Sequence, residues 1–398
     1  MKRRLRVAVV TETYPPEING VALSLARLLE GVGSHCDLEL VRVARSGLAP
    51  CPPQELRLAG FPLPGYARLR AGFPAWLRLW QRWSRQRPDV VHLATEGPLG
   101  LSALHIARRL RIAVSSDFRT HFEQYVGHYR VGWLEPLALA YLRSFHNRCH
   151  LNCVPTQALR VSLEAKGFQR LSVVPRGVDL GRFAPSRRQE SLRAAWSSDP
   201  RHTPILLCVS RMAAEKNLEV LLEAFRAARN QGRRAELVMV GDGPVRAALE
   251  RRYPEAQFVG MKTGTLLAEH YASADLFCFP SQSETFGNVT LEAMASGLPV
   301  IAYRHGAAAA LLEDQVQGWV LEDFGAQAFA AALAQALDRW QQHGPLAWQA
   351  MGFAARACAQ TQSWDAVTGQ MLGHWYALGR YPAFDPEADE QALPSRLL

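Results

Sequence analysis

The chain has 398 residues, of which 48% are hydrophobic and 20% are charged. This length predicts two or three domains that each bury a core, and the composition excludes a disordered, collagen-like or coiled-coil chain. Lys and Arg outnumber Asp and Glu by 29 to 15 in residues 1–200, whereas Asp and Glu outnumber Lys and Arg by 21 to 16 in residues 201–398. The net charge of +9 therefore belongs to the N-terminal half, which could face nucleic acid, an anionic membrane or an acidic substrate.

Cysteine usage and the first residues indicate the compartment. The seven cysteines are scattered along the chain, unlike those of a secreted disulfide scaffold, and they favour a reducing environment. Residues 7–10 form too short an apolar run for a signal peptide, and no run approaches the roughly 18 residues of a membrane span. We therefore expect a cytoplasmic protein that does not cross a membrane.

Short apolar runs alternate with longer stretches of helical periodicity. The runs that we interpret as buried strands are residues 5–10, 38–43, 90–93, 113–116, 151–155, 205–209, 236–240, 256–259, 276–280, 299–303 and 318–321. This order predicts an α/β fold with parallel, doubly wound sheets. Residues 178–204 interrupt the alternation, and we place a linker there.

Ligands bind beyond the carboxyl ends of the strands in such sheets, so we examined the loops that follow strands. The loop after residues 5–10 lacks G-x-G-x-x-G, which disfavours a dehydrogenase. It ends in Asn19-Gly20 before a predicted helix, where Gly20 either lets backbone N–H groups approach an anion or is a plain loop glycine.

Two cations follow the strand predicted at residues 205–209. Arg211 and Lys216 could converge on a diphosphate, Arg as a bidentate fork and Lys as a point charge. Surface loops often carry such residues, so a solvated loop is the competing interpretation.

Residues 276–300 carry the strongest pattern. A strand ends near Pro280, Glu284 lies in the following loop, and Gly287-Asn288 precede a short helix that contains Glu292. We expect Asn288 to cap that helix, whose first N–H groups could bind phosphate while the two carboxylates contact different parts of one ligand. Solvated glutamates on a strand-turn-helix unit are the alternative.

Glu284 and Glu292, with seven residues between them, resemble the E-x7-E signature of retaining glycosyltransferases of family 4, which have the GT-B fold. Agreement extends in order over Asn19-Gly20, the VPRGVD run of residues 174–179, Arg211 to Lys216 and the VGDGP run of residues 240–244. Residues 115–129 and 145–156 are most similar to bacterial GDP-mannose-dependent α-mannosyltransferases and sulfoquinovosyl-diacylglycerol synthases.

The resemblance implies two Rossmann-like domains that face a central cleft. It places the acceptor domain at residues 1–178 and the donor-binding domain at residues 179–363. Residues 364–398 would form a C-terminal helix and tail that cross back to the first domain.

The resemblance also assigns residue roles. Glu284 would contact the donor sugar, Glu292 the nucleotide ribose, and Arg211 with Lys216 the leaving diphosphate. The full set of implied donor-binding residues is Asn19, Gly20, Gly241, Gly243, Phe286, Gly287, Asn288, Val289 and Glu292. Many members place a His-Thr pair near the reacting sugar; here Arg119 stands where that His usually is and His121 follows, so both are candidate catalytic residues.

The implied reaction moves a hexose from GDP-mannose, or alternatively a UDP-sugar, to a hydroxyl acceptor, with a membrane lipid favoured. Fixed cations and N–H groups stabilise the departing diphosphate, and no Asp-x-Asp pair follows the predicted strands, so we expect neither a metal nor another cofactor. The alternatives are an epimerase or phosphorylase on the same fold, and a nucleic-acid-binding protein that uses the basic half. The latter leaves the C-terminal carboxylates unexplained, and we expect no nucleic-acid partner.

Two further segments permit more than one interpretation. His146, Cys149, His150 and Cys153 are of the types that bind zinc, but they adjoin a predicted buried strand, which favours buried thiols. Residues 66–87 place Phe73, Trp76, Leu77, Trp80 and Trp83 on one helical face and Arg78, Arg82 and Arg85 on another. A basic amphipathic helix with tryptophans suits a membrane interface. The segment directly precedes a predicted strand, however, so we expect its aromatic face to pack on the sheet, with the arginines free to touch anionic lipid head groups in a peripheral membrane contact.

Overall fold

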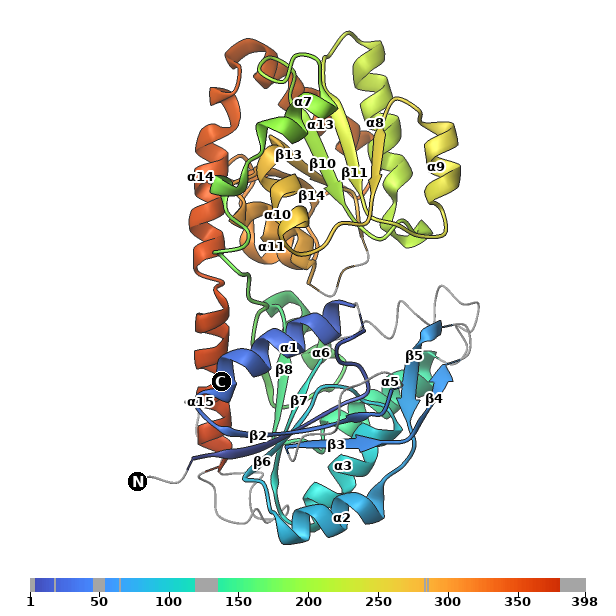
Figure 1. The fold of residues 1–398 in the computed structure, drawn as a ribbon, viewed down its shortest axis with the longest axis vertical. Helices are drawn as coiled ribbons and strands as arrows, with labels where there is room; N and C mark the ends of the chain where they lie inside the picture. Colours follow the sequence, from blue (N-terminus) through green and yellow to red (C-terminus); the bar gives the residue numbers. More distant parts are fainter. Residues whose placement is uncertain are drawn as a thin grey trace. The chain divides into compact units, whose positions relative to one another are not determined.

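The structure is a computed structural model that describes residues 4–17, 19–45, 54–63, 66–118, 135–282, 284 and 286–379. The chain divides into two compact units. The first unit comprises the described parts of Met1–Gly177 and Trp364–Leu398, and the second comprises those of Val178–Ser363. Each unit is built around its own parallel sheet (Figure 1).

Seven parallel strands form the sheet of the first unit, in the order β3-β2-β1-β6-β7-β8-β9. Their bounds are β1 Arg6–Thr11, β2 Asp37–Val43, β3 Glu55–Leu58, β6 Val90–Leu93, β7 Ala113–Asp117, β8 Leu151–Val154 and β9 Leu171–Val173. A separate antiparallel hairpin consists of β4 Gly60–Leu63 and β5 Tyr66–Gly72. The helices are α1 Gly20–Gly33, α2 Trp76–Arg85, α3 Pro98–Arg109, α5 Glu135–His146, α6 Gln157–Ala165 and α15 Trp364–Gly379.

Helices cover both faces of this sheet. Val7 and Val9 of β1 contribute to a core with α1 and with α15, whose Trp375 is fully buried. Ala8 and Val10, on the opposite face of the same strand, pack with α2 and α3. Burial on both faces explains why these strands are continuous apolar runs rather than alternating ones.

Six parallel strands form the sheet of the second unit, in the order β12-β11-β10-β13-β14-β15. Their bounds are β10 Ile205–Val209, β11 Glu236–Val240, β12 Gln257–Gly260, β13 Leu276–Phe279, β14 Val300–Tyr303 and β15 Gly318–Leu321. The helices are η2 Pro185–Arg187, α7 Glu190–Trp196, η3 Ala214–Lys216, α8 Leu218–Asn230, α9 Arg246–Arg252, α10 Gly264–Ser273, α11 Asn288–Ala295, α12 Gly306–Leu311, α13 Ala326–His343 and α14 Leu346–Gln360. Helices α8 and α13 pack on one face, and α10, α11 and α12 pack on the other.

The predicted fold class, two doubly wound parallel sheets, is confirmed. Every apolar run that was interpreted as a strand forms one, whereas β3, β9 and the β4–β5 hairpin were not predicted. No described helix has the length and apolar content that crossing a bilayer requires.

The interpretation of residues 178–204 as a linker is only partly right, because part of this segment is a packed helix. Residues 190–196 form helix α7, which buries Trp196 and Arg193 in the second unit. The two chain segments that lead into this unit run side by side, because the Val178 N–H donates to the Gln362 carbonyl at 2.9 Å. Residues 380–398 of the predicted tail lie outside the described part of the chain.

Helix α2 also corrects a prediction. Residues 66–72 belong to strand β5, so the helix is shorter than the segment 66–87 suggested. Its buried residues are Leu79 and Trp83, whereas Phe73, Trp76, Leu77 and Trp80 are exposed. The expectation that those four side chains pack on the sheet is therefore wrong.

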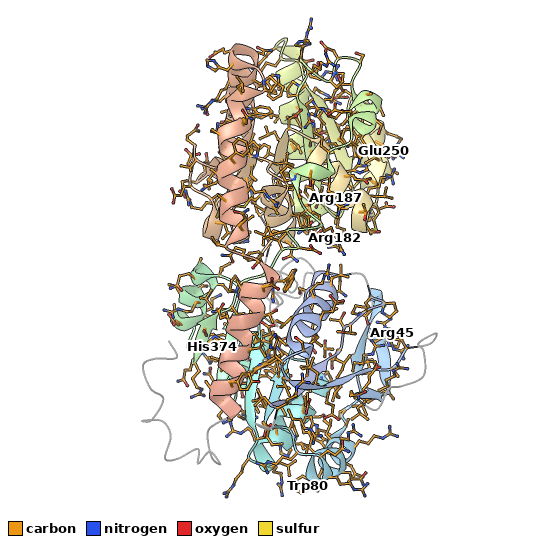
Figure 2. All side chains as sticks on the ribbon, turned by 60° about the vertical axis from the view of Figure 1, so that its left-hand side comes forward. Arg45, Trp80, Arg182, Arg187, Glu250 and His374 are labelled. Carbon is orange, nitrogen blue, oxygen red and sulfur yellow. The ribbon has the colours of Figure 1, made fainter. Side chains whose placement is uncertain are left out.

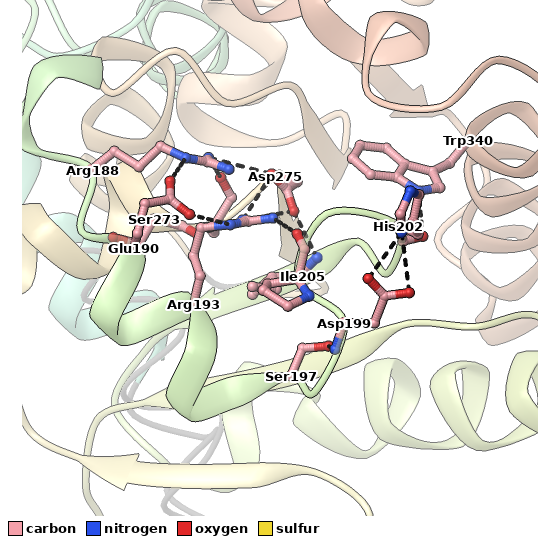
Figure 3. A network of polar contacts seen from close by, with 12 residues as sticks. Arg188, Glu190, Arg193, Ser197, Asp199, His202, Ile205, Ser273, Asp275 and Trp340 are labelled. Atoms are coloured by element: carbon pink, nitrogen blue, oxygen red, sulfur yellow. Dashed lines mark hydrogen bonds and ion pairs between the residues drawn. The ribbon is translucent and has the colours of Figure 1, made fainter.

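A buried arginine fastens α7 to the amino end of the second sheet (Figure 3). Arg193 Nη1 donates to Asp275 Oδ2 at 2.9 Å and to the Ser273 carbonyl at 2.8 Å. The same carboxylate oxygen accepts the Ile205 N–H at 2.9 Å, where β10 begins. This arrangement satisfies the charge of a guanidinium that is only 2% exposed.

We predict that Arg193→Ala lowers the unfolding free energy of the second unit by about 3–5 kcal/mol, because it removes the buried cation that faces Asp275 and leaves only the longer contact from Arg188. Chemical denaturation monitored by circular dichroism measures this loss. Arg188→Ala is the matched control: Arg188 contacts the same Asp275 at 3.4 Å, but its side chain is 38% exposed against 3% for Arg193, and its removal should cost less than about 1 kcal/mol. Equal losses in the two variants would contradict the assigned role of Arg193.

Candidate active site

The loops after β10 and β11 are hydrogen-bonded to each other along their length. The Ser210 N–H donates to the Val240 carbonyl at 3.0 Å, and the Met212 N–H donates to the Asp242 carbonyl at 2.9 Å. The two loops thus form one support, which positions the residues from Arg211 to Lys216 at the carboxyl edge of the sheet.

Glycine is required where these loops touch. A Cβ on Gly241, whose φ is 138°, would lie 1.9 Å from the Ser210 carbonyl oxygen, and one on Gly243 would lie 2.2 Å from the Met212 carbonyl oxygen. Packing between the loops therefore accounts for both glycines. Their proposed contact with a donor remains a prediction.

Lys216 and Glu284 meet at the carboxyl edge of the sheet. The Lys216 Nζ contacts Glu284 Oε1, and Ser281 Oγ donates to the same oxygen at 3.1 Å. Both charged side chains are mostly buried, so each satisfies the other in a partly dehydrated position.

Arg211 is not part of this contact. Its guanidinium pairs with Glu215 one helical turn along the loop, and 57% of its side chain is exposed. The structure thus brings together Lys216 and Glu284, and leaves Arg211 directed to a different carboxylate.

Helix α11 begins at Asn288, and its N-cap is Gly287. The prediction that Asn288 is the cap is wrong by one residue, because Gly287 adopts a left-handed conformation, φ 92°, that favours glycine. A Cβ on Gly287 would lie 3.5 Å from the Glu284 Cγ. The helix start and the glutamate loop are thus close neighbours, while Phe286 is buried and Val289 packs against the core.

Glu292 lies in a different environment from Glu284. Its Oε2 accepts a hydrogen bond from the Tyr271 hydroxyl of α10 at 3.1 Å. Burial raises the pKa of Glu292 to about 7, against the smaller opposing effects of that hydrogen bond and of Arg182. The two glutamates of the E-x7-E pattern therefore lie in different environments, Glu284 against a cation and Glu292 against a neutral hydroxyl.

Asn19 and Gly20 lie at the start of α1 in the first unit. Asn19 Oδ1 accepts the Ala22 N–H at 2.8 Å, which caps the helix, and Asn19 Nδ2 donates to Thr13 Oγ1 at 2.8 Å. A Cβ on Gly20 would meet no described atom within 4 Å, so local packing does not require glycine there. Arg119 and His121 lie outside the described residues.

Glu12 is a feature of the first unit that the sequence analysis missed. It is the first residue after β1, and its Oε1 accepts the Leu99 N–H at 3.0 Å and the Gly72 N–H at 3.3 Å. Burial raises its pKa to about 7, and the nearby charge of Glu96 adds to the shift. The signal that could have found it is a carboxylate directly after a buried strand, at the ligand-binding edge of the sheet.

The cysteine and histidine side chains near β8 do not converge on one point but contact different partners. His146 Nδ1 lies 2.8 Å from Ser116 Oγ, His150 Nδ1 accepts the Val114 N–H at 2.9 Å, and Cys149 and Cys153 are buried. Within the described ranges, no three His, Cys, Asp or Glu side chains are grouped as a metal site would need.

Comparison with protein families yields two matches that together span most of the chain. The family described as Glycosyltransferase Family 4 matches residues 18–182, and the family described as Glycosyl transferases group 1 matches residues 203–339. The predicted family resemblance is thus confirmed.

Individual relatives agree with this match. The chain is 35% identical over 389 residues to a GDP-mannose-dependent alpha-mannosyltransferase of Mycobacterium tuberculosis. The aligned region covers 94% of this chain and 97% of the relative. It is 30% identical to the sulfoquinovosyl transferase SQD2 of Arabidopsis thaliana, over 80% of this chain and 62% of the relative. It is also 30% identical to an alpha-monoglucosyldiacylglycerol synthase of Streptococcus pneumoniae, over 84% of this chain and 78% of the relative.

The fold is similar to that of solved structures. Anabaena HepE, whose structure is in complex with UDP and glucose, superposes with a TM-score of 0.71 at 17% identity, over 94% of this chain and 100% of HepE. At that identity the likeness concerns the fold.

We predict that Glu12→Gln stabilises the protein at pH 8 and not at pH 5. In the unfolded chain Glu12 ionises near its ordinary pKa of 4.5, whereas in the folded chain it does so near 7, so its ionisation opposes folding as the pH rises through this window. The neutral amide keeps an acceptor oxygen and avoids a cost on the order of 1–3 kcal/mol above pH 7.

Urea unfolding at both pH values measures the effect. Glu55→Gln serves as a control of opposite sign, because hydrogen bonds from Arg57 lower the pKa of Glu55 and its neutralisation should destabilise the protein at pH 8. The interpretation of Glu12 fails if Glu12→Gln changes stability equally at pH 5 and pH 8.

Proposed function

Because the chain belongs to glycosyltransferase family 4, we propose that it transfers mannose from GDP-mannose to a hydroxyl group of a lipid or glycolipid, with retention of anomeric configuration. The mannosyltransferase relative supports the donor, and the diacylglycerol-linked product named for another relative supports a lipid acceptor. The reaction would take place in the cytoplasm at the inner face of the membrane.

One observation carries the assignment of the donor site. Lys216 follows β10 and Glu284 follows β13, two strands that are neighbours in the sheet although the chain winds outward from them in opposite directions. Such a reversal of strand order is where ligands bind in open α/β sheets. The Lys216–Glu284 contact supports a site here that takes a phosphate and a sugar hydroxyl together.

Each group has a role in the proposed reaction. The Lys216 ammonium, joined by Arg211 if it leaves Glu215, neutralises the departing diphosphate, and the N–H groups at the start of α11 add to this stabilisation. Glu284 accepts hydrogen bonds from the sugar, and Glu292 accepts those of the ribose.

Bond changes occur on one face of the sugar. The bond from the anomeric carbon to the diphosphate oxygen breaks, and the bond to the acceptor oxygen forms on the same side. The acceptor's proton passes to the leaving phosphate oxygen. We propose that no metal is needed, because two cationic side chains and a helix terminus serve the diphosphate.

We predict that the purified protein forms a mannolipid from GDP-mannose and extracted bacterial lipids in the presence of EDTA. UDP-glucose should react at least about tenfold more slowly. Mass spectrometry of the lipid and NMR of the anomeric proton measure product and configuration. Preferred turnover of a UDP-sugar would overturn the donor assignment. Loss of turnover in EDTA that added Mg²⁺ or Mn²⁺ restores would overturn the metal-free mechanism.

We predict that Glu284→Gln lowers kcat by about a hundredfold or more, because the carboxylate contacts the sugar as charge develops. Affinity for GDP, measured by calorimetry, should change by less than about threefold. Glu322→Gln is the matched control: Glu322 also follows a strand of this sheet but is exposed and pairs with Arg304. Unchanged turnover in Glu284→Gln, or an equal loss in Glu322→Gln, contradicts the assignment.

A further inference from the structure

Helix α2 and the chain just before it expose a group of large apolar side chains on the first unit. Phe73, Trp76, Leu77 and Trp80 are 50%, 49%, 69% and 40% exposed, respectively. We call these four residues, with the adjoining face of α3, the α2–α3 surface; Trp80 marks it in Figure 2. Exposed tryptophans in such a group are unusual on a protein surface that contacts only water.

The orientation of α2 is fixed, so these side chains cannot turn inward. Trp83 and Leu79 are fully buried on the opposite side. Glu39 of β2 holds both the helix and its buried tryptophan: Arg82 Nε donates to Glu39 Oε1 at 2.6 Å, and Trp83 Nε1 donates to Glu39 Oε2 at 3.1 Å. Exposure of Trp76 and Trp80 therefore follows from the core contacts of the same helix.

The surface is hollowed between the two helices. Trp76, Leu77 and Trp80 line a shallow hollow of about 1020 Å³ that is open to solvent and extends over α3. Its other walls carry Leu101, Leu104 and the arginines Arg108, Arg109 and Arg148. Apolar and cationic groups thus adjoin on one face, as lipid tails and phosphates do in a bilayer.

Charge on these segments has a single sign. No Asp or Glu occurs in residues 56–88 or in residues 97–116, the stretches that contain α2 and α3. Arg78, Arg85 and Arg109 are exposed there, and the exposed Arg148, two residues past the end of α5, lines the same hollow as Arg109. A surface of this kind attracts an anionic leaflet, and tryptophan rings are stable at the boundary between head groups and acyl chains.

We propose that the α2–α3 surface docks on an anionic lipid bilayer. Trp76, Leu77 and Trp80 enter the boundary between head groups and acyl chains, while Arg109 and Arg148 contact lipid phosphates. This proposal rests on the lipid acceptor suggested above, but it involves neither the sugar donor nor the transfer reaction. Membrane docking and the proposed enzymatic function can therefore fail separately.

Co-sedimentation of the full chain with vesicles tests the proposal in the absence of any sugar nucleotide. Vesicles of phosphatidylcholine with about 30% phosphatidylglycerol should bind the protein at 0.1 M NaCl, and binding should weaken at least about tenfold at 0.5 M NaCl. Vesicles of phosphatidylcholine alone should bind weakly. Equal binding to both vesicle types overturns the electrostatic part of the proposal.

Two pairs of variants separate the apolar and cationic contributions. Trp76→Ser with Trp80→Ser, and Arg109→Gln with Arg148→Gln, should each weaken vesicle binding about tenfold or more, since each arginine near an anionic leaflet contributes on the order of fivefold. The matched controls are Leu346→Ser with Phe353→Ser, which are 73% and 68% exposed in the second unit, and Arg201→Gln with Arg339→Gln. Losses in the controls equal to those in the test pairs overturn the assignment to this surface.

Insertion is tested by fluorescence quenching with brominated phosphatidylcholine in the anionic vesicles. Trp76→Phe with Trp80→Phe should bind nearly as well as the original chain but lose most of the quenching, because the proposal places these two tryptophans in the bilayer. Quenching that survives in this variant overturns the insertion. Binding to a single-stranded oligonucleotide, lost with Trp76→Ser and Trp80→Ser while vesicles do not bind, identifies a nucleic-acid surface instead and overturns the proposal.

Discussion

Parallel strand pairing is the constraint on which both units depend. A parallel neighbour can be reached only through a crossover, so every loop that follows a strand leaves the sheet at the same edge. Where the chain reverses its direction of winding, two such loops diverge next to each other. In the second unit this brings Lys216 to Glu284 across 68 residues of sequence, and in the first it brings the Glu12 N–H to Thr95 Oγ1 across 83 residues. The strand order of each sheet thus sets the positions of these polar side chains without any bound ligand.

The same constraint explains how much of the fold could be predicted. Strands such as β1, β10 and β13 are buried on both faces, so their sequences are apolar runs that stand out from the helices between them. Strands β3 and β9 are short and only partly buried, and their sequences lack such a run. Likewise, the sequence shows that α2 is amphipathic but not which side faces inward. The orientation of α2 depends on Glu39, which lies more than forty positions away in the sequence and accepts hydrogen bonds from Arg82 and Trp83.

The candidate site was predicted as a set of residue types, and the structure adds how they are paired. Glu284 has a cation as its partner, whereas Glu292 has a neutral tyrosine hydroxyl and a pKa near 7. Spacing along the chain cannot distinguish these environments, because Lys216 and Tyr271 come from other elements. The Lys216–Glu284 contact also restricts the long Lys216 side chain before a ligand arrives. Less of its rotamer entropy is then left to be lost on binding. A diphosphate would then exchange one anionic partner of Lys216 for another, and free Glu284 for a sugar hydroxyl.

Under the proposed function, this pairing explains how an acidic half would bind phosphate. Lys and Arg are outnumbered in residues 201–398, and Lys216 is itself neutralised by Glu284, so long-range attraction of an anion is weak there and contact geometry must provide affinity. The arginines of the α2–α3 surface are in the opposite situation, because the segments around them contain no acidic residue and their charges add at a distance. A charge that acts by contact suits a ligand of fixed shape, such as a sugar nucleotide. Several arginines whose long-range attractions add together suit an extended anionic surface, on which no single phosphate has a fixed position.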